Sequence, residues 1–539
     1  MTKRAIIHVE NTEGVLDFTR YLVGAGWTIL TANKTEELLR REKIPFVREP
    51  ALVERNIFIA DTSKLIQYIM SSRYPEDESS GLNQSSDTDI YILCINLIPS
   101  VSLGASEQIY KEPVVPSNYY ISTLLRNSAA NFRNLLILTD PADYKEAIIQ
   151  LKTDNISEDF RLYLAAKALN MISAYDSGIA DTLLFSSKNK DSFVNYMTFP
   201  FKRYQNLKNG ANPHQSACLY TIPVQSGPMS ALQKLPTRDL NYNIITDASL
   251  AWEEICMLFT YLKNQFTVKS KNRDGYSFIT QFTPLKGTVF TIAIKYKSII
   301  GASLASNVVK SFKNTYTYDI SNISDVTVGC SSVVDEAAAK EIVKSNLSAI
   351  IAPGFTPKAK ETLSANKKIR LIPVSLILTS HYDMELFSGG LLVQDKDALI
   401  FDKWYVKTKN RPNQYMADQM IFGMMLAMAS RTYSAVVLKG NSIVGISQAC
   451  KSAEKAVTSV LTEAIDYQTR NGLPLDEPLG ELLVCDTEIK LCPAVKELIS
   501  RGVSTIIQTG GSENDEEFIQ YCDERNVVMV FTGMTHITY

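Results

Sequence analysis

The sequence predicts an α/β protein, and two observations carry that prediction. Short apolar runs bounded by turn residues alternate with stretches of helical spacing along the chain, and such alternation favours parallel sheets covered by helices. Hydrophobic residues make up 45% of the 539 residues, which is enough to fill packed cores. The length suggests about three domains.

The N-terminal part shows the alternation most clearly. RAIIHV (4–9) is typical of a buried strand. Behind it, Val15, Phe18 and Leu22 share one face of a predicted helix that a glycine ends. Residues 71–89 are rich in Ser, Asp and Glu, which is typical of a solvated loop. The other elements expected here are strands at 27–32, 44–49, 89–100 and 133–140 and a helix at 34–42.

A long helix is predicted at 157–185, roughly 40 Å in length at about 1.5 Å per residue. Ser157 is placed to cap its first turn, and Glu158 and Asp159 suit the positive end of its dipole. We expect a domain boundary within 190–205.

Strands and helices alternate again in two further blocks. The blocks are interpreted as two related α/β units, although the pattern contains no repeat of short period to establish this. Strands are expected at 218–222, 289–296, 350–354, 390–394, 434–446, 481–486, 503–511 and 526–531, and helices at 249–262, from 357, and at 412–430, 450–470 and 513–525.

Composition narrows the function classes. The formal net charge of -2 gives no electrostatic reason to expect nucleic acid or a membrane surface as a partner, and no run of about 18 apolar residues predicts a membrane span. The eight cysteines are scattered and form no C-x-x-C pair, so we expect free thiols in a reducing cytoplasm and no metal site. An imidazole base must be one of four histidines, at positions 8, 214, 381 and 536.

Several stretches, taken in order, resemble one known family. They are LKNGANPHQSACLY (207–220), SLAWEEI (249–255), IIAPGFTPKAKETL (350–363), SGGLLVQDKD (388–397) and STIIQTGGSENDEEFIQYCDERNVVMVFTGM (504–534). On these stretches the chain resembles, over nearly its full length, the bifunctional purine biosynthesis protein family, AICAR transformylase/IMP cyclohydrolase.

The resemblance implies an architecture. It implies a cyclohydrolase-like domain of methylglyoxal-synthase-like α/β fold over 1–195, followed by two cytidine-deaminase-like α/β subdomains of a transformylase region over 200–375 and 376–539. It also implies a cytoplasmic homodimer with transformylase sites at the subunit interface. The implied ligands are a purine-precursor nucleotide and 10-formyltetrahydrofolate as co-substrate, with no covalently bound cofactor. In this family the C-terminus enters the transformylase site, so we expect an ordered chain end.

The resemblance also implies where the transformylase site lies. Formyl transfer to AICAR needs a base for a weakly nucleophilic amine and donors for the oxyanion. The family uses a Lys-His pair and an Asn, with an Arg and a terminal His at the C-terminus. Here Lys295 keeps the lysine position and Tyr296 replaces the histidine, while Tyr433 replaces the Asn. Thr535 and Tyr539 replace the Arg and the terminal His. Lys208 and Asn209 replace an Arg-Tyr pair on the nucleotide, in a frame completed by Gly210, Asn212 and His214.

Tyr296 has two interpretations. A phenol with a pKa near 10 is rarely a base at neutral pH, although the charges of Lys295 and Lys297 would favour a phenolate. The alternative is a tyrosine that only fills the space of the histidine. In a strand, both neighbouring lysines would point away from it. The sequence reveals no other dense cluster of titratable groups.

The N-terminal site is also changed. In place of the family's phosphate-gripping loop, similar to KTLHPKIHGG, this chain has ERNIFIADTSKLIQYIMSSR (54–73), in which the lysine position becomes apolar near Ile59. The second family lysine aligns with Ala130. Where the family has turns similar to SVSDKTG and STGGTA, this chain has HVENTEG (8–14) and TANKTEE (31–37). They lack the glycine pair that lets a backbone approach a phosphate closely.

Six further features need an interpretation. His214 either contacts the nucleotide or is a loop histidine bonded to backbone, and His536 either compensates for a lost site residue or has no such role. QTGGSENDEE (508–517) is interpreted as a helix cap and not as an anion nest, because its acids repel anions. Arg126 is interpreted as a surface ion pair, and His8 and His381 as structural.

Three functional hypotheses remain. The first is a family member that keeps the fold and a nucleotide pocket but has impaired or lost formyl transfer and cyclohydrolase chemistry. The second is an enzyme acting on an AICAR-like nucleotide. The third is a true bifunctional enzyme of purine biosynthesis, converting AICAR and 10-formyltetrahydrofolate to FAICAR and then closing the ring to IMP. The sequence favours the first, because both sites changed at several positions at once.

Overall fold

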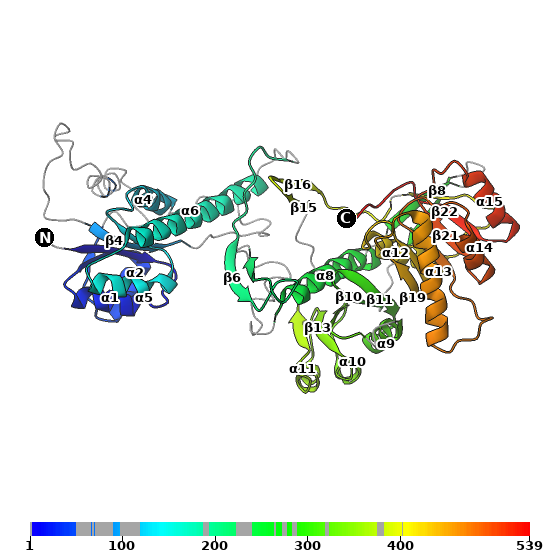
Figure 1. The fold of residues 1–539 in the computed structure, drawn as a ribbon, viewed down its shortest axis with the longest axis horizontal. Helices are drawn as coiled ribbons and strands as arrows, with labels where there is room; N and C mark the ends of the chain where they lie inside the picture. Colours follow the sequence, from blue (N-terminus) through cyan, green and yellow to red (C-terminus); the bar gives the residue numbers. More distant parts are fainter. Residues whose placement is uncertain are drawn as a thin grey trace. The chain divides into compact units, whose positions relative to one another are not determined.

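The computed structural model describes residues 3–49, 66, 69, 90–97, 119–186, 193–221, 240–263, 266–271, 277–282, 288–318, 323–374, 382–401 and 403–538. The chain forms two compact units (Figure 1). Unit 1 consists of Met1–Tyr204 and Tyr220–Gln225, and unit 2 of Gln205–Leu219 and Ser226–Tyr539. Tyr539, the predicted loop at 71–89, Ile59 and His381 lie outside the described residues.

Unit 1 is built on a parallel sheet. Its strands are β1 (Arg4–Val9), β2 (Thr28–Thr31), β3 (Val47–Arg48), β4 (Ile90–Asn96) and β5 (Leu136–Leu138), in the order β3-β2-β1-β4-β5. Its helices are α1 (Val15–Gly24), α2 (Asn33–Arg41), α4 (Tyr119–Ala130), α5 (Tyr144–Lys152) and α6 (Glu158–Ser186), with a 3₁₀ turn, η3 (Pro141–Asp143). Ile6 packs with residues of α4 and α6, and Ile7 packs with residues of α1 and α5, so the central strand is buried on both faces. The predicted parallel α/β fold is confirmed here.

The local predictions in unit 1 also hold. Val15, Phe18 and Leu22 are buried on α1, and the Ser157 hydroxyl accepts a hydrogen bond from the Phe160 amide at 3.2 Å, capping α6. Arg126 pairs with Asp176 at 2.6 Å, and both side chains are partly exposed, which confirms the surface ion pair.

Unit 2 contains two blocks with one order of elements, except that β8 (Phe266–Lys271) and β9 (Ser277–Phe282) are inserted between the first two elements of the first block. The first is α8 (Tyr242–Lys263), β10 (Val289–Lys295), β11 (Ser298–Ala305), α9 (Val308–Tyr318), β12 (Val326–Cys330), α10 (Glu336–Ile342), β13 (Leu347–Ala352), α11 (Pro357–Ser364) and β14 (Arg370–Pro373). The second is α12 (Gln414–Met428), β18 (Ala435–Lys439), β19 (Ser442–Ser447), α13 (Ala453–Arg470), β20 (Leu482–Cys485), α14 (Pro493–Ser500), β21 (Thr505–Gln508), α15 (Asp515–Glu524) and β22 (Val528–Phe531).

One sheet joins the two blocks. Its order is β14-β13-β12-β10-β11-β19-β18-β20-β21-β22, extended by β17 (Lys403–Val406), β8 (Phe266–Lys271) and β9 (Ser277–Phe282). The blocks therefore mirror each other across the β11–β19 junction, which supports two related α/β units. Each block contains an antiparallel hairpin, β10–β11 or β18–β19, and later strands that pair in parallel. This sheet is therefore mixed and not purely parallel.

The two central helices share one face of the mixed sheet. Phe290, Ile292 and Ile294 of β10 pack in one cluster with residues of α8 and α12. Val289 and Ala293 of the same strand pack in another cluster with residues of α9. This alternation lets one strand serve both layers.

Two small hairpins stand apart from this sheet. One is β6 (Lys202–Leu207) with β7 (Ala217–Thr221), and the other is β15 (Tyr382–Phe387) with β16 (Gly390–Asp395). All eight cysteines are free, and Cys218 and Cys450 are the two that are not fully buried. No helix in the described ranges combines the length and the apolar composition needed to cross a membrane.

Candidate functional site

The loop between β6 and β7 carries most of the predicted nucleotide contacts. The Gln215 side chain is its centre, because its oxygen accepts hydrogen bonds from the Asn212 backbone amide at 3.0 Å and from the Asn212 side chain at 3.1 Å. The Gly210 amide donates to the Gln215 carbonyl at 2.7 Å. A Cβ on Gly210 would lie 2.9 Å from the Gln215 Cβ, so only glycine permits this close approach. The sequence therefore builds a rigid loop around an asparagine, a glycine and a glutamine.

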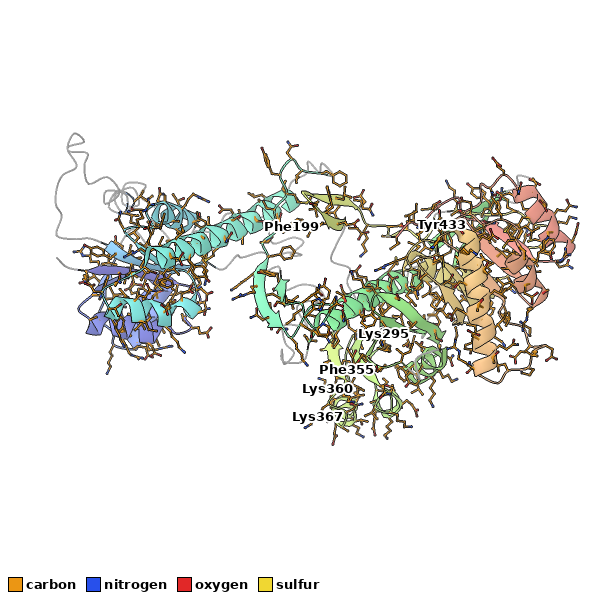
Figure 2. All side chains as sticks on the ribbon, in the orientation of Figure 1. Phe199, Lys295, Phe355, Lys360, Lys367 and Tyr433 are labelled. Carbon is orange, nitrogen blue, oxygen red and sulfur yellow. The ribbon has the colours of Figure 1, made fainter. Side chains whose placement is uncertain are left out.

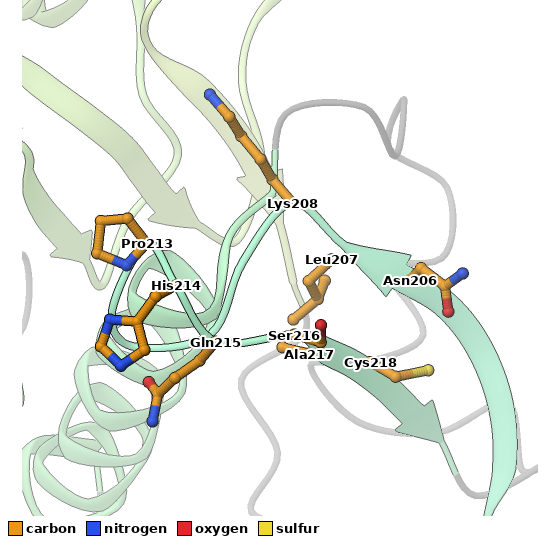
Figure 3. A pocket seen from close by; sticks show the side chains of 9 residues that line it. All are labelled: Asn206, Leu207, Lys208, Pro213, His214, Gln215, Ser216, Ala217 and Cys218. Carbon is orange, nitrogen blue, oxygen red and sulfur yellow. The ribbon is translucent and has the colours of Figure 1, made fainter.

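This loop lines a pocket of about 520 Å³, within the size range of small-molecule sites. Figure 3 shows His214 and Gln215 close together, with the Lys208 side chain extending away from them. His214 is exposed, and no hydrogen bond of its ring is recorded among the described residues. The lining is Asn206, Leu207, Lys208, Pro213, His214, Gln215, Ser216, Ala217 and Cys218.

Lys295 and Tyr296 lie at the tip of the β10–β11 hairpin and not within a straight strand (Figure 2 labels Lys295). Lys295 pairs with Ser298 across the tip, so Tyr296 and Lys297 form a two-residue turn. The Lys295 ammonium donates to the Ser324 carbonyl at 2.6 Å and lies 5.3 Å from the centre of the Tyr296 ring. The strand-based expectation that both lysines face away from Tyr296 is therefore wrong, because a turn removes the alternation.

The tip has an unusual backbone for its residues. Tyr296 and Lys297 have φ values of 50° and 61°, in the left-handed region that suits glycine and asparagine. Each such residue raises the energy by about 1–3 kcal/mol. Two hydrogen bonds oppose this strain, because the buried carboxylate of Asp247 on α8 accepts the Tyr296 amide at 3.0 Å and the Lys297 amide at 2.7 Å. Burial raises the pKa of Asp247, and these two bonds lower it in part.

Helix α8 brings the pocket loop and the hairpin tip together. The Asn243 side chain donates to the Ala211 carbonyl of the pocket loop at 3.2 Å, and Asp247 holds the tip one turn later. Residues four apart share a helix face, with Cβ atoms about 5–6 Å apart. The structure therefore joins two groups of predicted site residues that are separated by about 85 positions of sequence.

Tyr433 lies beside the end of the chain. Its amide and carbonyl pair with Cys450, and the preceding Thr432 amide donates to the Thr538 carbonyl at 3.0 Å (Figure 2 labels Tyr433). The Thr538 hydroxyl donates in turn to the Met428 carbonyl at 2.9 Å. The chain end through Thr538 is thus docked, as expected, although the predicted contact of Tyr539 lies outside the described residues.

The segment that carries Tyr433 is also linked by hydrogen bonds to the start of β11, next to the hairpin tip. The Gln448 side chain donates to the Ile299 carbonyl at 2.9 Å and accepts the Ile299 amide at 3.1 Å, so it bridges β11 and the end of β19. Next to it, Ala449 donates to the Arg431 carbonyl. The predicted residues of both blocks therefore belong to one hydrogen-bonded region of unit 2.

His536 holds the end of the chain in place through both nitrogens of its ring. Its ring is buried, with Nδ1 2.7 Å from an Asp397 carboxylate oxygen and Nε2 2.9 Å from the Ile400 carbonyl. Both partners are acceptors, so both bonds form together when each ring nitrogen carries a proton. A ring engaged at both nitrogens has no nitrogen left to act as a base at the hairpin tip.

A second cluster of titratable groups escaped the sequence analysis. Lys396 pairs with Glu253 of α8 at 2.5 Å, beside the fully buried Glu254. Burial, and then the charge of Glu253, raise the pKa of Glu254 to about 8, against the opposing effect of Lys396. Burial also raises the pKa of Asp383 on β15. Glu253 and Lys396 are 143 residues apart in the sequence. Their stretches, SLAWEEI and SGGLLVQDKD, contain the charged residues of this cluster, but in the sequence these acids look like ordinary solvated residues.

Asp486 is a buried carboxylate behind the Tyr433 loop. Both of its oxygens accept the Ser434 amide, at 3.0 and 3.1 Å. Burial raises the pKa of Asp486 to about 6, and hydrogen bonds from Ser434 and Thr432 oppose the rise. The residue therefore fixes the loop that carries Tyr433.

In the described part of unit 1, two backbone amides at the carboxyl ends of the strands are engaged by a side chain. The Asn96 side chain accepts the amides of Glu10 at 2.7 Å and Asn11 at 2.9 Å, and Glu10 pairs with Lys34 at 2.9 Å. Asn33 has a φ of 55°, so the turn keeps a left-handed residue without glycine. The amides of Glu10 and Asn11 are thus engaged, next to a carboxylate that would repel a phosphate.

Two further predictions concern the segment 508–517 and His8. The Gly511 amide donates to the Asp515 carboxylate at 2.8 Å at the start of α15, but the N-cap residue Asn514 makes no side-chain cap bond, so the predicted cap is not found in that form. The first turn of α15 still carries three acids, Asp515, Glu516 and Glu517, which suit the positive end of the helix dipole. His8 is buried on β1, in line with a structural role. In the described part of the chain, no group of three or more His, Cys, Asp or Glu residues is arranged to hold a metal ion.

Comparisons with known proteins identify a family for this chain. A family model described as AICARFT/IMPCHase bienzyme matches residues 128–459. The chain is 26% identical over 546 residues to the bifunctional purine biosynthesis protein PurH of Brachyspira hyodysenteriae and 27% identical over 545 residues to that of Clostridium acetobutylicum, with 100% of each chain covered. A solved structure titled ForH is 21% identical, and the match covers 34% of this chain and 100% of that one at a TM-score of 0.28, too low to carry an argument.

Proposed function

Because the chain belongs to the AICARFT/IMPCHase bienzyme family of purine biosynthesis, we propose that it binds an AICAR-like purine-precursor nucleotide but has lost ordinary formyl transfer and cyclohydrolase chemistry. The proposed ligand site is the pocket at Lys208 and His214 together with the Lys295–Tyr296 tip. The co-substrate that the family would supply is 10-formyltetrahydrofolate.

One observation carries this proposal. The position that needs a base holds Tyr296, whose ring is 64% exposed, and His536 is engaged at both ring nitrogens. His214, the other described histidine of unit 2, belongs to the pocket loop. Loss of a general base lowers a rate about 10²–10⁴-fold, and loss of an oxyanion donor about 10²–10³-fold. With both changed, the scaffold supports binding better than it supports turnover.

The pocket loop favours an anionic ligand. Lys208 and His214 supply an ammonium and an imidazole with no recorded partner among the described residues, and the loop that carries them is rigid. Unit 1 differs at the ends of its strands, because the Asn96 side chain accepts the amides of Glu10 and Asn11 and Lys34 is paired with Glu10. We therefore assign nucleotide binding to unit 2 and expect none at unit 1.

A specific observation favours the alternative of an active enzyme. The Lys295 ammonium lies 5.3 Å from the centre of the Tyr296 ring, so the two side chains stand together at the position of the family's Lys-His pair. A tyrosine that acts in place of the histidine would supply the missing base. Loss of turnover in Tyr296→Phe would identify this alternative.

Replacing Lys208 with alanine is expected to weaken AICAR binding about tenfold, since one charge-assisted contact to the phosphate is lost. Isothermal titration calorimetry measures the change. Lys360→Ala is the matched control, because Lys360 is an exposed lysine of α11 without a recorded ion pair and should leave the affinity unchanged (Figure 2). Equal effects of the two variants would exclude the pocket as the nucleotide site.

We further propose a homodimer in which the β15–β16 hairpin contacts the second copy. Leu386, Phe387 and Leu392 are 84%, 54% and 60% exposed on this hairpin. The strand register places Leu386 on one face and Phe387 and Leu392 on the other, so both faces of the hairpin expose apolar side chains of the kind found at contact sites. We also propose that the chain divides into domains at 195–200 and at 375–376.

Leu386→Arg is expected to convert the dimer to monomer, because a charge would be buried at the contact. Sedimentation velocity gives the mass of each species. Leu475→Arg serves as control, since Leu475 is 79% exposed in the segment between α13 and β20. A dimer that survives Leu386→Arg would remove the hairpin from the interface.

A further inference from the structure

Asp247 is a buried acid that has no place in the chemistry described so far. It lies on the second turn of α8, is 2% exposed, and makes its two recorded hydrogen bonds to the backbone amides of Tyr296 and Lys297. A bare carboxylate is poorly tolerated in a core unless hydrogen bonds satisfy it. Here both satisfying bonds come from the one turn that presents the candidate site side chains.

The second block shows what this turn looks like without the carboxylate. Its β18–β19 hairpin has the same two-residue tip, Gly440 and Asn441, between Lys439 and Ser442. Gly440 takes the positive φ at 57°, and the Gln419 side chain of α12 donates to its carbonyl. Lys439 pairs with Glu477, whereas Lys295 has no carboxylate partner recorded. One block therefore uses glycine at its tip, and the other uses tyrosine and lysine together with an acid.

The position of Asp247 on α8 links the tip to the pocket. Asn243, four residues earlier on the same helix face, bonds to the Ala211 carbonyl of the pocket loop. The facing charged groups are Lys295 and Lys297, which both act on the Asp247 carboxyl. The first turns of α8 thus form a common support for two segments that approach from different parts of the sequence.

We propose that Asp247 is a positioning residue of the ligand site: through its two amide bonds it holds the Tyr296–Lys297 turn left-handed, so that Lys295 and Tyr296 face a nucleotide held by the loop 208–215. The identity of the ligand rests on the proposed function. The role of Asp247 in setting the turn does not.

The test is a thermodynamic cycle that combines Asp247→Ala with Lys297→Gly. Asp247→Ala is expected to weaken AICAR binding about tenfold or more, because two charge-assisted hydrogen bonds are lost. Glycine at position 297 adopts a positive φ freely, so in the Lys297→Gly background the loss should fall below about threefold. Asp335→Ala, which removes a carboxylate bonded to the Ala338 amide at 2.8 Å, is the control and should not alter the affinity.

Two outcomes overturn the proposal. An equal loss in both backgrounds would make Asp247 a general structural residue. A crystal structure of Asp247→Ala in which the Tyr296–Lys297 turn is unchanged would also overturn the proposal. This measurement needs no ligand. If the wild type does not bind AICAR, the proposed function fails, and the crystal structure still decides the role of Asp247. Should Asp247→Ala not fold, Asp247→Asn keeps the shape and one acceptor, and an intermediate loss of affinity is expected.

Discussion

Returning an imidazole to position 296 and an amide to position 433 is expected to raise the rate of formyl transfer to AICAR by about 10²-fold or more over the wild type. A positioned general base contributes about 10²–10⁴-fold by itself. The backbone is suited to the change, because histidine and asparagine adopt positive φ values more readily than most residues, and Tyr296 has a φ of 50°. Tyr296 and Tyr433 are 64% and 37% exposed, so smaller side chains leave no large core cavity.

The measurement is the appearance of tetrahydrofolate after mixing Tyr296→His/Tyr433→Asn with AICAR and 10-formyltetrahydrofolate. Tyr296→Phe/Tyr433→Phe is the control, since it changes the same positions without adding a base or an amide. A rate no higher than that of the control would mean that the scaffold no longer aligns the two substrates. In that case the loss would reach beyond the reacting groups.

Glu254→Gln is expected to stabilise the protein by about 3 kcal/mol at pH 7 and by almost nothing near pH 4. Burial raises the pKa of Glu254 from 4.5 to about 8, so the folded state holds a proton that the unfolded state releases. The stability contributed by this carboxyl is therefore fully present below about pH 4.5 and is lost as the pH rises through about 8. Glutamine stays neutral and avoids this loss.

Chemical denaturation of wild type and variant between pH 5 and about 8 measures the difference. Glu253→Gln is the matched control on the adjacent residue. Glu253 is partly exposed and pairs with Lys396, so its replacement should lower stability slightly at neutral pH. A gain from Glu254→Gln that does not grow with pH would show that the Glu254 carboxyl is not held protonated in the folded state.

Much of the fold could be predicted from periodicity. The helix face of Val15, Phe18 and Leu22, the cap at Ser157 and the central strand β1 all follow from short-range pattern, because each element decides its own burial. The duplicated order of elements in unit 2 was only an interpretation, since it depends on strand pairing that brings β11 beside β19. Strand pairing is a long-range property that spacing along the chain does not specify.

The site was harder to predict for the same reason. The positions of Lys295, Tyr296 and Tyr433 came from resemblance, but their geometry did not. The turn at Tyr296 depends on Asp247, which is 49 residues away in sequence, and the cluster around Glu254 depends on Lys396. Polar residues that meet only after folding look like ordinary surface residues in a sequence.

The most direct test of the account is a single-turnover experiment with the wild-type protein in excess over AICAR. The excess protein first binds all of the AICAR, as followed by calorimetry, and the complex is then mixed with 10-formyltetrahydrofolate while tetrahydrofolate absorbance is recorded. We predict that AICAR binds and that no tetrahydrofolate forms above the uncatalysed background. Formation of tetrahydrofolate that disappears in Tyr296→Phe would contradict it, and would show that the tyrosine itself is the base.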